Sequence, residues 1–370
     1  MINQPIQPQA RQPRGVVKIN GVRTQWVSWE LDNNAFYQAD TFRVKLALSA
    51  QPDPTIFASA SELDVEIFAG FPADPANYTE AELKSLIYGL VDDVTYDPVQ
   101  AVVELSGRDF TSVLVDTKTT EKWPNLTASQ IAEQIAKAHD LTPVVTATTA
   151  KVGTYYEIDH ARLSTQRSEW DVLTYLANEE GYMVYVRGRE LHFEPRPSPD
   201  AEPYVLTWQA PTTERGHAIF DGKSVMFSRN LTLAKDVTVY VRSWNAKNNQ
   251  GFTQKAKSAR TKNTVLKKAA QPIGEPQVYT FNIPGLTPEQ ALQRAQSLLR
   301  EITAHEVKMT AHLPADNVLD ITKMIQVVGT GTAFDQMYYP DSIIRQMSLS
   351  DGYQMTIHGK NHSPESVVQA

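Results

Sequence analysis

The histidines are the first residues of this chain whose type and spacing could do chemistry. His358 and His362 lie four residues apart, a spacing that on a helix would present both rings to one metal ion. The pattern around them is that of a strand end followed by a polar tail, and no acidic ligand stands at a useful spacing. His305 and His312 flank a predicted strand and lie too far apart to bind one metal without a third element. We therefore expect surface histidines and no metal site.

Acidic residues and glycines give equally weak signals. Asp92, Asp93 and Asp97 form a group that could hold a cation, but their positions favour solvated carboxylates at strand ends. The sequence GTGTAFD at 329–335 lacks the lysine and the strand–helix context of a phosphate loop, so it indicates a hairpin turn. We predict no enzyme, no catalytic residue and no cofactor. Any two carboxylates could still meet in space, so a glycan hydrolase using Glu and Asp residues of the middle domain stays open as an alternative.

A polar, basic segment at 245–268 is the one candidate contact site, predicted to be a mobile loop. Phe252 is its single aromatic residue, which is too few for a platform that stacks nucleic-acid bases, so backbone electrostatics would limit any DNA contact. A nucleic-acid-contacting module stays open as a second alternative. The basic side chains proposed to contact a partner are Lys247, Lys255, Lys257, Arg260, Lys262, Lys267 and Lys268.

Composition describes an ordinary folded protein of two or three domains. The 370 residues are 41% hydrophobic and 21% charged, and there is no cysteine, which excludes disulfides and thiolate zinc sites. No run approaches the roughly 18 apolar residues of a membrane span. Residues 1–15 hold three prolines and no apolar core, so we expect a flexible arm and no secretory signal. The net charge is −7 in residues 1–110, −5 in 111–204 and +5 in 205–370, which indicates a contact surface on the basic part.

Alternation of apolar and polar residues predicts a small antiparallel β-barrel or sandwich over 1–110, with a loop at 71–80. Residues 111–204 favour a mixed α/β domain. It has one helix capped by Thr127 and another capped by Ser168, followed by a hairpin that turns at Gly188. Helical spacing predicts that three side chains of the second helix are buried against the hairpin and the first helix. These are Trp170, Leu173 and Leu176.

A proline-rich linker, PRPSPDAEP, is expected to end the middle domain. Strand patterns then return over 205–370, and we assign this part to a second β-domain with a short C-terminal tail. A basic and helical insertion is predicted within it at 245–304, where a helix begins after Thr287. The fold class is therefore mostly β, with two β-domains flanking an α/β domain.

A weak internal repeat relates the two β-domains. The segment FRVKLALSA corresponds to HEVKMTAHLP, and LIYGLVDDVTYDPVQAVVELSGRD corresponds to QMYYPDSIIRQMSLSDGYQMTIHGKN. Each copy gives a strand, an aspartate, a second strand, and a last strand ending in glycine, a basic residue and Asp109 or Asn361. We predict that the two β-domains share one strand order. Chance likeness between two β-meanders is the alternative.

Several blocks resemble one known family. VELSGRDFTSVLVD, WPNLTASQIAEQIAKAHDL, SEWDVLTYLANEEGYMVYVRGRELHF and VVGTGTAFDQMYYPDSIIRQMSLSDGYQMTIHGKN, in this order, are similar to the baseplate hub proteins of contractile phage tails. This is the late control gene D family, whose hub part is shared by type VI secretion spike proteins. The likeness extends over residues 15–362 and rests on domain order more than on any one motif.

The resemblance implies a homotrimer in which two tail-tube-like barrels per chain form a ring of six around a channel. Such a ring joins a six-fold tail tube to a three-fold central spike. The implied partners are the tail tube or a tube-terminating protein, the spike protein and other baseplate proteins, with DNA only as transient cargo of the channel. The implied location is the virion tail baseplate, assembled in the host cytoplasm. The chain ends soon after the last barrel strand, so we expect spike and cell-wall cleavage to belong to other proteins.

Overall fold

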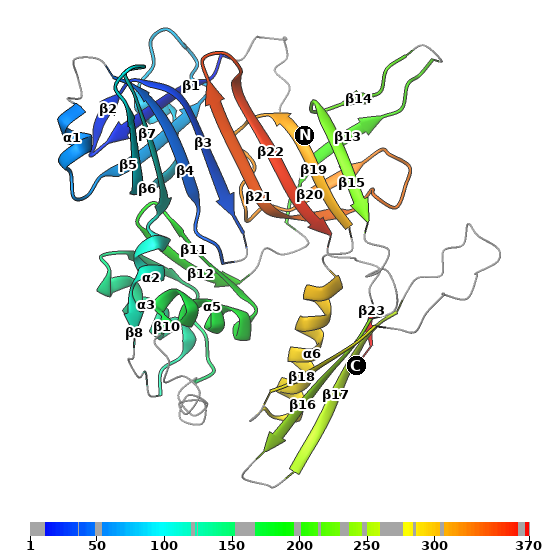
Figure 1. Cartoon of the computed structure of the whole chain (residues 1–370). Coiled ribbons are helices and arrows are strands. Elements are labelled where there is room, and N and C mark those ends of the chain that lie inside the picture. Colours follow the sequence, from blue (N-terminus) through cyan, green and yellow to red (C-terminus); the bar gives the residue numbers. More distant parts are fainter. Residues whose placement is uncertain are drawn as a thin grey trace.

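The structure is a computed structural model of the chain. It describes residues 12–369 except 36, 49–53, 120–122, 124, 152–166, 196–200, 214–215, 230–236, 246–249, 260–276, 284–285, 304–306 and 362–366. The fold is mostly β, and one 14-stranded sheet runs through two β-units that lie side by side, with an α/β unit between them in the sequence packed beside the first (Figure 1). No helix among the described residues is long and apolar enough to span a membrane.

The first β-unit takes its shape from strands with strict two-residue alternation. In the strand that begins at Thr41, the side chains of Phe42, Val44 and Leu46 are buried and their neighbours are not. The hydrogen-bonded order is β3-β4-β7-β6-β5-β1-β2, all antiparallel. The strands are β1 (Arg14–Ile19), β2 (Val22–Thr24), β3 (Trp26–Asn34), β4 (Thr41–Ala47), β5 (Asp64–Gly70), β6 (Lys84–Asp97) and β7 (Val102–Asp109), with short helices α1 (Pro54–Ser59) and η1 (Glu80–Glu82) between them.

The second β-unit repeats this strand order. Its order is β15-β19-β22-β21-β20-β13, with β14 beside β13. Each strand stands at the same place in chain order as its counterpart in β3-β4-β7-β6-β5-β1, so the predicted shared strand order is confirmed for the described strands. One orientation differs, since β13 is parallel to β20 while β1 is antiparallel to β5. The strands are β13 (Tyr204–Gln209), β14 (Ile219–Phe220), β15 (Ser224–Arg229), β19 (Val307–Pro314), β20 (Ile325–Val328), β21 (Met337–Ser348) and β22 (Gly352–Asn361).

A repeated irregularity supports this correspondence more strongly than strand order does. The β6·β7 pairing has one extra residue at Asp92, and the β21·β22 pairing has one at Asp341. Both bulges lie at the same distance from the residue pair that contains Asp109 or Asn361. In each copy the bulged aspartate accepts hydrogen bonds from the basic residue of the neighbouring strand, at 2.7 Å from Arg108 and 2.6 Å from Lys360. A bulge with the same ion pair twice is not expected of two unrelated meanders.

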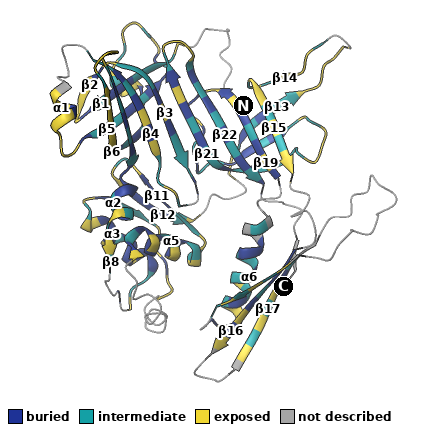
Figure 2. Cartoon of the chain, viewed as in Figure 1, coloured by how far each residue is buried: buried dark blue, intermediate teal, exposed yellow. Residues whose placement is uncertain are grey.

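The two β-units join edge to edge. Residues Ser342–Ser348 of β21 pair antiparallel with Asn34–Ser28 of β3, so the sheet is continuous across the junction. One apolar core extends through both units, and it contains Leu31, Leu105, Tyr338 and Ile357. In Figure 2 the central strands alternate between buried and less buried residues along their length.

The middle unit packs three helices on a three-stranded sheet of order β11-β12-β9. Thr127 and Ser168 each form the capping box, with Gln130 and Asp171, and Gly181 ends the second helix with a positive φ. Trp170, Leu173 and Leu176 are buried with the hairpin and the first helix in one core, as predicted. The elements are α2 (Thr111–Asp116), β8 (Lys118–Thr119), α3 (Ala128–Ala138), β9 (Thr142–Val145), β10 (Arg167–Ser168), α5 (Glu169–Glu180), β11 (Tyr182–Arg187) and β12 (Glu190–Pro195).

The insertion differs from its expected form. Gln250–Ala259 is a strand of a separate sheet of order β18-β16-β17-β23, so the prediction of a loop at these residues is wrong. Val237–Asn245, expected with the second β-unit, also lies in this sheet, and its valines form a core with α6. The valines of β16 alternate with other residues and face α6. A strand of a β-barrel shows the same alternation, so the sequence pattern does not distinguish the two cases. The bounds are β16 (Val237–Asn245), β17 (Gln250–Ala259), β18 (Gln277–Asn282), α6 (Pro288–Thr303) and β23 (Val367–Gln369).

Candidate assembly interface

The basic residues singled out by sequence lie partly on the insertion sheet. Lys255 is exposed and Lys257 is half-buried, and both are on β17. The other five, Lys247, Arg260, Lys262, Lys267 and Lys268, fall outside the described residues. Ala256, between the two lysines, is buried toward α6, so the lysines lie on the opposite face of the sheet.

That open face is more aromatic than the sequence segment indicated. Strand pairing places Lys255 opposite Tyr240, Lys257 opposite Thr238, and the half-exposed Trp244 opposite Gly251. Arg242 shares the face, because it lies between Tyr240 and Trp244 at two-residue spacing. Sequence reasoning missed Tyr240 and Trp244, because they come from the strand before the basic segment. The face thus combines basic and aromatic side chains.

The histidines and the aspartate group are structural in the described part of the chain. His312 hydrogen-bonds Thr356 at 2.9 Å and His358 hydrogen-bonds Thr310 at 3.2 Å, across β19 and β22. Asp97 caps its own turn by accepting from the backbone N–H groups of the next residues. His305 and His362 lie outside the described residues, which contain no cluster of three possible metal ligands. The 329–335 segment is a turn between β20 and β21, as predicted.

A cavity of about 550 Å³ lies between β6, the β11–β12 hairpin and residues 317–321. Each of its basic side chains is engaged by the protein. Arg189 lies over the rings of Tyr88 and Phe110, with its guanidinium carbon 4.5 Å from the Phe110 centroid. Arg345 donates to the carbonyls of Asp316 and Leu319. Arg345 also donates to the side-chain oxygen of Asn33 at 2.9 Å and so joins the second β-unit to the first, while Arg189 joins the middle unit to Tyr88 of the first β-unit.

Two carboxyl groups at this cavity resist ionisation. Burial raises the pKa of Asp40 to about 7, and burial together with the nearby Asp40 charge raises the pKa of Asp109. Both groups hold loops in place. Asp40 accepts from the backbone N–H of Asn34 at 2.6 Å, and Asp109 accepts from the backbone N–H of Thr111 at 3.1 Å. Sequence reasoning did not single out Asp40, and it named Asp109 only as the end of the repeated strand pattern.

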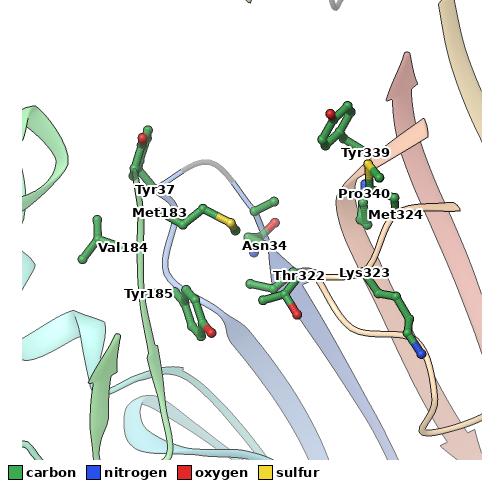
Figure 3. A pocket seen from close by; sticks show the side chains of 12 residues that line it. Asn34, Tyr37, Met183, Val184, Tyr185, Thr322, Lys323, Met324, Tyr339 and Pro340 are labelled. Carbon is green, nitrogen blue, oxygen red and sulfur yellow. The ribbon is translucent and has the colours of Figure 1, made fainter. Parts of the chain in front are cut away.

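Figure 3 shows a smaller cavity at the junction of the three units. Its volume is about 30 Å³, and β3, β11, β21 and residues 321–324 supply its walls, including Tyr37, Met183 and Tyr339. Such a volume corresponds to roughly one or two water molecules. Around it, Tyr37 binds the middle unit twice, since its hydroxyl donates to the Tyr182 carbonyl and its own carbonyl accepts from the Trp170 indole. The first β-unit and the middle unit are therefore in direct hydrogen-bonded contact beside this cavity.

Two strand segments of the sheet, the second half of β6 and most of β15, have a described neighbouring strand on one side only. Beyond Val91, β6 pairs with β7 on one side, and no described strand lies on its other side. Likewise Ser224–Ser228 of β15 pair with β19 alone among the described strands. Val94 and Tyr96 on β6 are 40% and 47% exposed, although they share the core-facing side of the sheet with the buried Leu105 and Val103. Unpaired edges with apolar side chains are templates for pairing with another chain.

Comparison with solved structures identifies the fold. No family model and no curated protein matches the sequence. A tail protein from Neisseria meningitidis MC58 has a TM-score of 0.68 at 14% identity, covering 96% of this chain and 99% of its own. The 43 kDa tail protein of prophage MuSo2 from Shewanella oneidensis has a TM-score of 0.65 at 16% identity, covering 94% and 98%.

A third similar structure comes from a secretion machine. The E. coli c3393 protein, a component of the type VI secretion system described as similar to phage T4 tail proteins gp27 and gp5, has a TM-score of 0.50 at 11% identity, covering 96% of this chain and 79% of its own. At these identities the likeness concerns the fold. The chain therefore has a phage tail protein fold that also occurs in type VI secretion.

Proposed function

We propose that this chain is the structural hub of a contractile tail baseplate. Three copies form a ring of six β-barrels around a channel for the genome, and the ring joins the six-fold tail tube to the three-fold central spike. The observation that carries the proposal is the repeated β-unit, with its shared strand order and bulge, inside one chain. Two similar units in each of three chains give six similar positions, which is what a match between three-fold and six-fold symmetry requires.

The proposal assigns the parts of the chain separate tasks. Residues 1–110 and 205–370 supply the two barrels, and 111–204 brace the ring from outside. The basic and aromatic face around Lys255 and Trp244, with the other basic residues of 245–268, contacts a tail partner. The tail tube, the spike and other baseplate proteins are the proposed neighbours, in a virion assembled in the host cytoplasm.

No catalytic step belongs to this proposal. The alternative of a glycan hydrolase was assigned to Glu and Asp residues of the middle domain. Asp40 and Asp109, just outside that domain, line a described cavity with raised pKa values, so the alternative is tested at this pair. A peptidoglycan-release assay with the purified protein and an Asp109→Asn variant tests this alternative. Release that disappears in the variant would replace the structural role by a hydrolytic one.

We expect the purified protein to be a trimer with three times the chain mass of 41.4 kDa. Each chain offers two different edges, so the contacts are heterologous and close into a ring. Light scattering at several concentrations gives the mass, and negative-stain microscopy should show ring-shaped particles with a central hole. A stable monomer or a two-fold dimer contradicts the proposed hub.

We expect ring assembly to slow as salt concentration rises, while a formed ring survives moderate salt. The part that ends in β6 and β7 carries net charge −7 and the part that contains β15 carries +5, so their attraction speeds encounter and is screened over about 8–10 Å at physiological salt. Buried apolar contacts hold the ring afterwards. Stopped-flow scattering after dilution from denaturant measures the rate, and an assembly rate independent of salt would contradict this charge-guided encounter.

A further inference from the structure

We infer that β6 of one chain pairs with β15 of the next chain in a register that the chain itself records at its β3·β21 junction. This inference rests on the proposed ring and adds to it the strands, the residue pairs and the direction of contact. A second copy of this chain is the partner. The two edges lie on opposite sides of the described sheet system, with β6 toward the left and β15 toward the right in Figure 1.

The correspondence between the two β-units makes β6 the equivalent of β21. Asp109 and Asn361 occupy the same place beside the bulge, so Ser342 to Gln346 correspond to Asp93 to Asp97. In both copies the first half of the strand pairs with an earlier strand of its own unit, β20 or β5. In β21 the half beyond the bulge pairs with β3, whereas in β6 no described strand lies there. The second half of β6 is therefore equivalent to the segment of β21 that pairs with β3, but it has no described strand beside it.

The equivalent of β3 follows in the same way. β3 pairs with β4 as β15 pairs with β19, and β4 and β19 are aligned through β7 and β22. This alignment places Leu31 with Phe227 and Asp32 with Ser228. Phe227 keeps partial exposure where Leu31 is fully buried. The outer side of β3 is covered by β21, and the outer side of β15 has no described strand.

Transfer of the junction register then gives residue pairs between chains. Asp32 faces Ile344 and Leu31 faces Arg345 within the chain. The equivalent pairs between neighbours put Ser228 opposite Thr95, Phe227 opposite Tyr96, and Met226 opposite Asp97. Successive pairs point to opposite faces of the sheet, as in any antiparallel ladder, and Phe227 and Tyr96 point to the core side.

Burial supports the transfer. Ile343 and Arg345, which β3 covers, are 0% and 4% exposed, while their equivalents Val94 and Tyr96 are 40% and 47% exposed. The same positions of the same fold are thus buried where a neighbouring strand is present and open where it is absent. Pairing with β15 of a second chain would bury Val94 and Tyr96 and satisfy the backbone groups of both edges.

The test uses the absence of cysteine from the chain, which makes every disulfide an engineered one. Thr95→Cys and Ser228→Cys are combined in one chain, since both residues are exposed and face each other in the inferred pairing of β6 with β15 of the next chain, here called the seam. Mild oxidation should then give a covalent trimer on a non-reducing gel. The matched control is Glu30→Cys with Gln346→Cys, an exposed pair of the same ladder type within the chain, which should close a disulfide without joining chains.

The outcomes separate the seam from the hub. A protein that is trimeric by light scattering but forms no Thr95–Ser228 cross-link, while the control pair closes, would overturn the seam and leave the hub proposal standing. A protein that is monomeric at every concentration overturns both. Dimers formed by the Thr95→Cys variant alone would indicate pairing of β6 with β6 and would also overturn the inferred seam.

A second variant tests the seam without cysteine. Tyr96→Asp places a charge opposite Phe227 of the neighbour and should reduce the trimer at least tenfold at a fixed micromolar concentration. Leu349→Asp is the control, because Leu349 is 81% exposed at a hairpin tip outside the inferred pairs. Loss of the trimer in Leu349→Asp with retention in Tyr96→Asp contradicts the inference.

Discussion

Replacing Leu173 by alanine should lower the free energy of unfolding by about 2–5 kcal/mol. Leu173 has no exposed surface, and it lies in the core that α5 shares with α3 and the β11–β12 hairpin. Truncation removes buried methyl groups and leaves a cavity that two helices and a sheet on three sides cannot close. Urea unfolding of the variant and the parent, measured at one low protein concentration, gives the difference.

The control for this variant comes from the same helix. Glu179→Ala changes an exposed position near the end of α5 and should alter the free energy of unfolding by no more than about 0.5 kcal/mol. Equal unfolding midpoints for Leu173→Ala and the parent would mean that the middle unit does not unfold with the rest of the chain or that this core is not formed.

The chain should become more stable as pH falls from about 8 to 6. Asp40 has a pKa of about 7 in the folded chain, above its usual value of 3.8, so the folded state binds a proton that the unfolded state has released. This contribution is fully present below the unfolded pKa and is lost as pH rises through the folded pKa. The buried Asp109 has its pKa shifted in the same direction, which reinforces the sign.

Asp109→Asn should reduce this pH dependence and raise the free energy of unfolding at pH 8, because it removes the contribution of Asp109 while Asp40 still titrates. Asparagine stands at the equivalent place, Asn361, in the second β-unit, where its side-chain oxygen accepts from the backbone N–H of Val307. The introduced asparagine would keep an acceptor for the backbone N–H of Thr111 and remove one charge beside Asp40.

Thermal unfolding from pH 5.5 to 8.5 measures both effects. Asp140→Asn makes the same chemical change at an exposed position just after α3 and should leave the slope unchanged. An Asp109→Asn variant with the parent's slope, or a parent whose stability rises toward pH 8, would show that the Asp40 and Asp109 carboxyl groups do not govern stability in this range.

The sequence by itself determined the local elements, because their signals lie within a few residues. Thr127 with Gln130 and Ser168 with Asp171 form capping boxes, and Gly181 supplies the left-handed residue that ends α5. Alternation along β4 and β22 marked strands with one buried face. The internal repeat was also visible, since each copy has an aspartate on one strand and a last strand that ends in glycine, a basic residue and Asp109 or Asn361.

Only the tertiary structure decided which strands become neighbours. The pairing of β3 with β21 brings together residues about 300 positions apart, and the loop-closure free energy that it must overcome leaves no local pattern. The sheet of β16, β17 and β18 needed α6 to define its buried face, so the sequence assigned its first strand to the wrong sheet.

The chemistry of the candidate surfaces depended on tertiary structure for the same reason. Asp92 was one of three similar aspartates until the bulge placed it against Arg108, and Asp40 had no distinguishing neighbour until folding brought Asp109 beside it in a cavity. Tyr96 alternates like any strand residue, and it is exposed because no described strand lies on that side of β6. Charge, burial and free edges depend on which residues become neighbours in space, and that is decided by packing of the whole chain.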